Sequence, residues 1–219
     1  MGINLGSIAT TPQNIKETYQ LPEGVEKVDR GQAGGLSLNL SKGVSLDLTK
    51  ALPTLNNVKV GLGWDANHTQ AVDLDVFALL LHNGKIHDAS DVIFFNQKDT
   101  GKGVRLNEDN RNGVGEGDDE TMAVLLSNVP KDVTSIIFFV NVYDAETKRQ
   151  NFGMVKNAYI RLINEDTGKE EAIYVLNEQG GLYTAFKFAE LERNASGWSF
   201  KTLGEGTHGN VQTIVNQYL

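Results

Sequence analysis

Apolar and polar residues alternate along most of the chain in short runs. Within Leu36–Leu40, Val44–Leu48 and Val58–Trp64, every second residue is apolar, which is typical of antiparallel strands with one buried face. Further apolar, β-branched runs lie between turn signals, at Asp73–Leu81, Val92–Phe95, Met122–Leu126, Ser135–Tyr143, Ala158–Ile163, Ala172–Leu176, Tyr183–Leu191 and Trp198–Thr202. The pattern predicts an all-β fold, a two-sheet antiparallel β-sandwich.

Two segments depart from this period. Asn210–Leu219 carries apolar residues at helical spacing and predicts a short C-terminal helix, and Ala145–Phe152 predicts a turn or two of helix. Residues 1–35 show no sustained apolar period and end in a glycine cluster, which indicates an N-terminal extension and linker. One folded domain is therefore expected over residues 36–219.

The acidity of the chain is concentrated in one loop, residues 107–120. The whole chain has 20 Lys and Arg against 28 Asp and Glu, a net charge of −8, and this window holds six of the acids and one base. Gly113, Gly115 and Gly117 alternate within it, so its backbone can wrap tightly. Carboxylates, Asn carbonyls and backbone carbonyls are calcium ligands, although an acidic run can also be a solvated loop.

A second pair of carboxylates lies on the most apolar strand. Asp73 and Asp75 are two residues apart, so strand geometry places both on one face, about 6–7 Å apart. They would complete a cation shell if the acidic loop lay over them, or they could be exposed edge residues. Asp65 and Asn96 are further oxygen donors at strand ends.

The loop fits neither of two common calcium motifs. With Asp109 at position 1 of an EF-hand, positions 3 and 6 are Arg111 and Val114, where the motif needs Asp or Asn and then Gly. A calcium β-roll needs tandem glycine-rich repeats, and this run occurs once. Mg²⁺ fits less well than Ca²⁺, because it prefers one or two carboxylates with water and phosphate.

Several function classes find no support. The chain has no cysteine, which excludes thiolate metal sites and a cysteine nucleophile, and its four histidines form no zinc motif. Its acidity argues against nucleic acid, and no stretch is apolar enough for a transmembrane segment, so a cytoplasmic protein is expected. Gly204–Gly209 matches GxGxxG, but only ten residues follow, so a turn with a helix cap is expected.

The order of motifs resembles the TerD family of tellurium-resistance and stress-response proteins. The resemblance runs from about residue 36 to the C-terminus and rests on five segments, Val60–Asp65, Asp73–Asp75, Asp109–Glu120, Gln150–Gly153 and Ala158–Arg161. The sequence departs from the family pattern in residues 1–35 and at Thr207–Asn210. It implies a β-sandwich that binds Ca²⁺, expected as two ions, with partners in a stress-response or membrane-associated complex. The candidate metal ligands are Asp65, Asp73, Asp75, Asn96, Asp109, Asn110, Gly113, Gly115, Asp118, Asp119 and Glu120.

Three functions remain open at this point. The first is a non-enzymatic calcium-binding module whose metal orders the acidic loop and forms a surface for partners. The second is a metal-dependent enzyme acting on a phosphate or oxyanion, which the lack of a His or Lys close to the loop disfavours. The third is a calcium-dependent, lectin-like sandwich. Direct tellurite chelation is disfavoured, because carboxylates repel an oxyanion and soft thiolates are missing.

Overall fold

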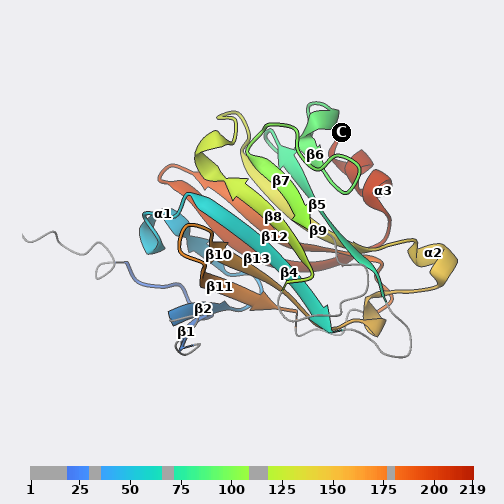
Figure 1. Ribbon diagram of the computed structural model, residues 1–219, viewed down its shortest axis with the longest axis horizontal. Coiled ribbons are helices and arrows are strands. Elements are labelled where there is room, and N and C mark those ends of the chain that lie inside the picture. The colour runs from blue at the N-terminus through green and yellow to red at the C-terminus, as the bar shows by residue number, and fades with distance from the viewer. Residues whose placement is uncertain (1–18, 30–35, 66–71, 109–117, 177–180) are drawn as a thin grey trace, which may run out of the picture.

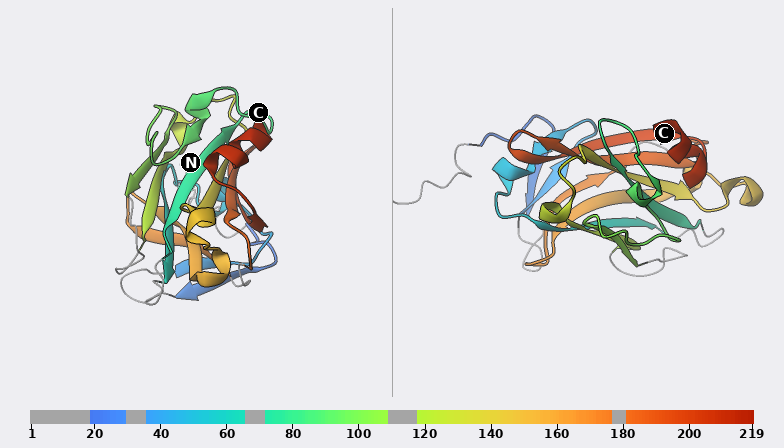
Figure 2. Two further views of the ribbon diagram at one scale, coloured as in Figure 1. Left: turned by 90° about the vertical axis from the view of Figure 1, so that its right-hand side faces the viewer. Right: turned by 90° about the horizontal axis from the view of Figure 1, so that it is seen from above.

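The computed structural model describes residues 19–29, 36–65, 72–108, 118–176 and 181–219. In this part of the chain, strands form two sheets that pack face to face (Figure 1; Figure 2). Sheet A has, in spatial order, β1 (Val25–Asp29), β2 (Leu36–Leu40), β11 (Lys169–Val175), β10 (Lys156–Asn164), β4 (Asn57–Asp65), β8 (Glu120–Leu125) and β7 (Val104–Glu108). Sheet B has β3 (Ser45–Asp47), β13 (Gly197–Thr207), β12 (Ala185–Asn194), β9 (Ser135–Val142), β5 (Leu74–Leu81) and β6 (Val92–Ile93).

The strands pair antiparallel except for β2 and β11, which are parallel. Side chains of alternate positions from both sheets fill the space between them. The predicted two-sheet sandwich is therefore confirmed.

Strand β5 is buried on both faces, which explains its unbroken apolar sequence. Leu74, Val76 and alternate residues after them face the core between the sheets. Phe77 and Leu79 point to the outer face of sheet B, where helix α3 (Val211–Val215) covers them with the side chain of Ile214. Sheet B thus has a second, smaller apolar cluster on its outer face.

The remaining helical segments are short. They are α1 (Leu48–Ala51), α2 (Ala145–Lys148) and the 3₁₀ turns η2 (Ala89–Asp91), η3 (Leu126–Asn128), η4 (Phe152–Met154) and η5 (Asn216–Tyr218). Asn210 caps α3, because its side chain accepts from the backbone N–H of Thr213 while the Thr213 hydroxyl accepts from the N–H of Asn210. None of these helices is long and apolar enough to cross a membrane.

Three local expectations change. The turn expected at Gly204–Gly209 was wrong in its first half, since β13 continues to Thr207 and Gly204, at φ 59°, lies where the register with β12 shifts. Strand β7 was not expected, because its five residues contain only two apolar side chains. Strand β1 comes from the stretch expected to be an extension, and it pairs with β2 along the edge of sheet A.

Candidate functional site

The carboxylates of interest lie at one end of the sandwich, called here the acidic end. Strand β4 ends there at Asp65, whereas β5 and β8 begin there at Leu74 and Glu120. Because these strands are antiparallel, acids far apart in sequence reach the same end of the fold. The predicted ligands among the described acids at this end are Asp65, Asp73, Asp75, Asp118, Asp119 and Glu120. Asp144, which follows β9, also lies there.

Asp118 lies on the outer face of sheet A in a network of ionised side chains. Its Oδ1 accepts from Arg161 Nε at 2.6 Å, and Arg161 Nη1 lies 3.1 Å from Glu170 Oε2. The carboxylate rests directly on Gly61, where a Cβ would lie only 2.3 Å from it. In the same way, Gly63 leaves room for the phenol of Tyr159. The alternating glycines of β4 therefore accommodate an ion pair that any larger residue would displace.

The pKa values of the neighbouring groups follow from this pairing. Burial, with the charge of Asp118 beside it, raises the pKa of Tyr159 to about 12. Burial disfavours the Arg161 cation, but hydrogen bonding and attraction to Asp118 and Glu170 outweigh it and raise the pKa of Arg161. Asp118 consequently functions as one partner of a structural ion pair.

Asp119 is buried beside two other acids. Its backbone N–H donates to the carbonyl of Leu62 at 2.7 Å, and its Oδ2 accepts from the backbone N–H of Trp64 at 2.9 Å. Burial, and then the charges of Asp118 and Asp65, raise the pKa of the Asp119 carboxyl despite the Trp64 hydrogen bond. A nearby cation would stabilise the ionised form of this group.

Glu120 connects the two sheets. It is 2% exposed, lies on the same face of β8 as Met122, and accepts from the backbone N–H of Val76 at 2.5 Å. On the side of β5 that faces β6, pairing begins only at Ala78, so Val76 has no neighbouring strand there. The Glu120 carboxylate therefore satisfies a strand N–H that has no ladder partner on that side.

Asp73 and Asp75 lie on the opposite side of the molecule from Asp118, at the outer face of sheet B. Asp75 is 8% exposed and faces Asn141 across the β5–β9 pair. The Oδ1 atom of Asn141 is buried and finds no hydrogen-bond donor among the described residues. Lys148 Nζ lies 3.9 Å from Asp73 Oδ2 and 4.6 Å from the centre of the Tyr143 ring.

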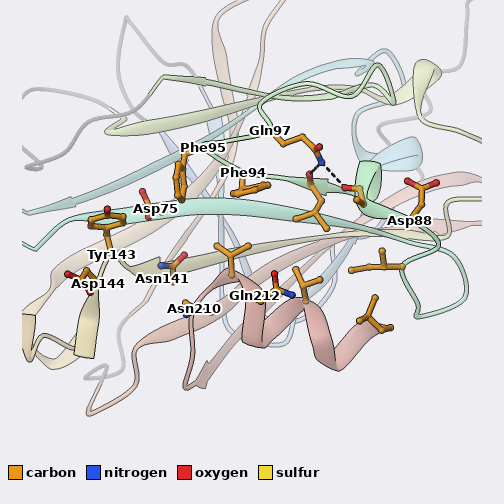
Figure 3. Close-up of a pocket in the computed structure, with 16 residues that line it drawn as sticks. Asp75, Asp88, Phe94, Phe95, Gln97, Asn141, Tyr143, Asp144, Asn210 and Gln212 are labelled. Atoms are coloured by element: carbon orange, nitrogen blue, oxygen red, sulfur yellow. Dashed lines mark hydrogen bonds between the residues drawn. The ribbon is translucent and has the colours of Figure 1, made fainter. Parts of the chain in front are cut away.

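A groove of about 870 Å³ opens beside these residues, between sheet B and α3 (Figure 3). Figure 3 shows Asp75, Asn141 and Tyr143 together at one end of it, with Phe95 above them. The described residues that line the groove include three carboxylates and no Lys, Arg or His. Asp75 and Asp144 make the end of the groove beside Asn141 negatively charged, Asp88 lies at the other end, and the wall beneath α3 is apolar.

The remaining predicted ligands are less well placed to share a metal ion with these residues. Asp65 is exposed and accepts from Asn157 Nδ2 at 2.6 Å, and Asn96 is exposed in the turn after β6. The other predicted ligands, Asp109, Asn110, Gly113 and Gly115, lie outside the described residues. Within the described ranges, the predicted acids do not gather three ligand atoms within 4.8 Å of one another.

One group in the described part of the chain does meet that distance, although no sequence motif predicts it. It consists of His82, His87 and Asp132, at the other end of β5. The only sequence signal was the Asn83-Gly84 turn, which folds the chain back between the two histidines.

These features define an all-β sandwich whose acids converge from several strands on one end. The chain belongs to the TerD family, since the TerD domain model matches residues 36–218. It is 44% identical over 187 residues to "Tellurium resistance protein TerD" of Serratia marcescens, covering 84% of this chain and 97% of that protein. It is 41% identical over 189 residues to "General stress protein 16U" of Bacillus subtilis (strain 168), with 84% and 97% coverage.

A solved structure has the same fold. The crystal structure of a homologue of telluride resistance protein (TerD) from Streptomyces coelicolor A3(2) superimposes with a TM-score of 0.61. It is 23% identical, and the match covers 74% of this chain and 95% of that one. The predicted family is confirmed.

Proposed function

We propose that this protein is a calcium-binding member of the tellurium-resistance and stress-response family that acts as a non-enzymatic, metal-dependent interaction module. The observation that carries the proposal is the buried oxygen pair at the acidic end, in which Asp75 faces the unsatisfied Oδ1 of Asn141 across two paired strands. Directly opposed residues have Cβ atoms about 4.5–5.5 Å apart, close enough to share one ion.

The donor chemistry fits Ca²⁺. Asp73 and Asp75 supply carboxylate oxygens and Asn141 supplies an amide carbonyl, all hard ligands of the kind that calcium takes in sets of six to eight. The bound cation would supply positive charge that neutralises these carboxylates. The sequence-predicted ligands between residues 109 and 117 would complete the set.

Two ions are proposed because the acids fall on two sides of the sandwich. Asp73 and Asp75 belong to the outer face of sheet B, whereas Asp119 lies with Asp65 at the end of β4. The raised pKa of Asp119 supports a second ion there, since a cation relieves the repulsion among neighbouring carboxylates.

A binding role rather than catalysis is proposed because two of the described cations at this end are engaged by carboxylates. Lys148 lies beside Asp73 and the Tyr143 ring, and Arg161 is held by Asp118. Neither is placed as an unpaired general acid or base. Ordering of the acidic end by metal would present a surface to partners in a stress-response or membrane-associated complex. Cytoplasmic residence is proposed from the cysteine-free sequence.

Thermal unfolding with calcium or with a chelator tests the proposal. A ligand that binds only the native state adds about 2.7 kcal/mol at 100 times its Kd, so calcium should raise the Tm of the wild type. Asp75→Asn should lose most of this shift. The exposed Asp166→Asn, at the far end of sheet A beside Asn57, should keep it. A wild-type Tm that is the same with calcium and with chelator would refute the proposal.

A further inference from the structure

The end of β5 opposite the acidic end brings two histidines and a carboxylate together. The rings of His82 and His87 stack with centroids 3.8 Å apart and planes inclined by 11°. His82 Nδ1 lies 3.1 Å from Asp132 Oδ2. One ligand atom from each of the three residues lies within 4.8 Å of the other two.

The local fold fixes these positions through backbone hydrogen bonds. His82 directly follows β5 and donates its N–H to the carbonyl of Lys85 across a turn in which Asn83 and Gly84 both have positive φ. The turn that carries Asp132 is held beside it, because the backbone N–H of Thr134 donates to the carbonyl of Leu81 and the Thr134 hydroxyl accepts from the N–H of Asn83. His82 and Asp132 are thus held in place by the sheet.

A buried carboxylate contacts the other ring nitrogen of His82, Nε2. Both oxygens of Asp91, which is fully buried, lie 3.2 Å from His82 Nε2. Asp91 also accepts from Lys102 Nζ at 2.7 Å and from the backbone N–H groups of His87 and Asp88. A carboxylate held by these three donors accepts a hydrogen bond from Nε2–H, which assigns the N–H to Nε2 and the lone pair to Nδ1.

The lone pair of Nδ1 therefore meets another acceptor, the carboxylate of Asp132. Although the two atoms are 3.1 Å apart, Nδ1 makes no hydrogen bond of acceptable geometry with the described residues. A cation about 2.0–2.1 Å from each atom would subtend an angle of roughly 100°, close to the tetrahedral value that zinc favours. The arrangement of carboxylate, histidine and open lone pair is the one that commonly orients a metal-bound imidazole.

We propose that His82 Nδ1, the imidazole of His87 and the carboxylate of Asp132 bind a divalent transition metal of the Zn²⁺ type. Imidazole nitrogens select Zn²⁺, Ni²⁺, Cu²⁺ or Co²⁺ over Ca²⁺, which takes oxygen ligands. His87 and Asp132 are exposed, so the His87 ring can rotate out of the stack to direct a nitrogen at the ion. Asp91 acts as a positioning residue, and solvent supplies the remaining ligands.

Titration of the full chain with Zn²⁺, and with Co²⁺ for its visible spectrum, tests this site. We expect the wild type to bind one Zn²⁺ that calcium does not displace, and Co²⁺ to give the absorption of a tetrahedral nitrogen and oxygen site. His87→Gln and Asp132→Asn should each weaken binding at least tenfold. His208→Gln, at an exposed histidine far along the chain, should leave it unchanged.

Asp91→Asn tests the support behind His82, and we expect it to weaken zinc binding 10- to 100-fold. Because Asp91 is buried, circular dichroism must first show that this variant folds, and the His87 variant carries the test if it does not. Absence of zinc binding by the wild type, or equal binding by His87→Gln and His208→Gln, would overturn the proposal. Neither outcome bears on calcium at the acidic end.

Discussion

The two ends of β5 offer different donor atoms to a cation. At its start, Asp73 and Asp75 present oxygens alone, with Asn141 on the neighbouring strand. At its finish, His82 presents a nitrogen, with His87 and Asp132 beside it. From Asp75 to His82 the strand rises by roughly 23 Å, at about 3.3 Å per residue. One rigid strand thus separates a site suited to hard ions from one suited to borderline ions.

The two ends also differ in whether their buried carboxylates have positively charged or hydrogen-bonding partners. At the imidazole end, Lys102 and two backbone N–H groups hold Asp91 ionised behind His82. At the acidic end, Asp119 is buried beside other acids and its pKa is raised. His82 is therefore held in position without metal, whereas the acids at the acidic end repel one another until a cation arrives.

Among the acids at the acidic end, Glu120 is expected to contribute most to folding stability in the absence of metal. Glu120→Ala removes the acceptor for the Val76 N–H and leaves a cavity between the sheets, so the free energy of unfolding should fall by about 2–4 kcal/mol. Urea denaturation in the presence of a chelator measures this loss. The exposed Glu192→Ala should change stability by no more than about 0.5 kcal/mol. A loss below about 1 kcal/mol at Glu120 would contradict its sheet-bridging role.

A second, smaller loss is expected on the outer face of sheet A. Arg161→Met leaves the carboxylates of Asp118 and Glu170 without their shared cation, and we expect a cost of about 2 kcal/mol. A double-mutant cycle with Asp118→Asn isolates the pair, because the two losses should not add. Full additivity in chelator would show that the Arg161 and Asp118 side chains do not stabilise one another.

Asp119 should behave oppositely to Glu120. Because its pKa is raised on folding, the stability linked to its protonation is present below the unfolded pKa and is lost as pH rises through the folded pKa. Asp119→Asn keeps an acceptor for the Trp64 N–H and removes the charge. We expect the metal-free variant to gain about 0.5–1 kcal/mol at neutral pH, and the gain to vanish as pH falls toward about 4. Unfolding curves across this pH range measure it, with Asp166→Asn as control, and a destabilised variant would contradict it.

Calcium binding at one end of β5 is expected to have almost no effect on zinc binding at the other. Two ions roughly 23 Å apart are separated by more than two Debye lengths at physiological salt, so their direct interaction is well below 1 kcal/mol. Saturating calcium should therefore alter the Kd for zinc by less than about twofold. Competition between the two metals, or a tenfold change, would show that both occupy the same end.

The fold was predictable because its cues are local. The alternation around Val60 and Leu62 identifies β4, and the long apolar run of β5 marks a strand buried on both faces. Strand β7 escaped prediction because it carries too few apolar residues. The bulge at Gly204 escaped because it is set by the partner strand β12, which the local sequence does not specify.

The site was predictable only where its residues are contiguous or share one strand face. The acidic loop stands out in the sequence. The ion pair of Asp118 does not, because its partner Arg161 lies on a neighbouring strand far along the chain. Asn141 lies beside Asp75 only through the β5–β9 pairing. His87 and Asp132 are 45 positions apart, and sheet topology alone joins them to His82.

Calorimetric titration of the wild type, Asp75→Asn and His87→Gln with calcium measures whether Asp75 binds the ion at the start of β5. We expect calcium binding by the wild type and by His87→Gln, with binding at the sheet B face lost in Asp75→Asn. Absence of calcium binding by the wild type, or an unchanged isotherm in Asp75→Asn, would contradict it.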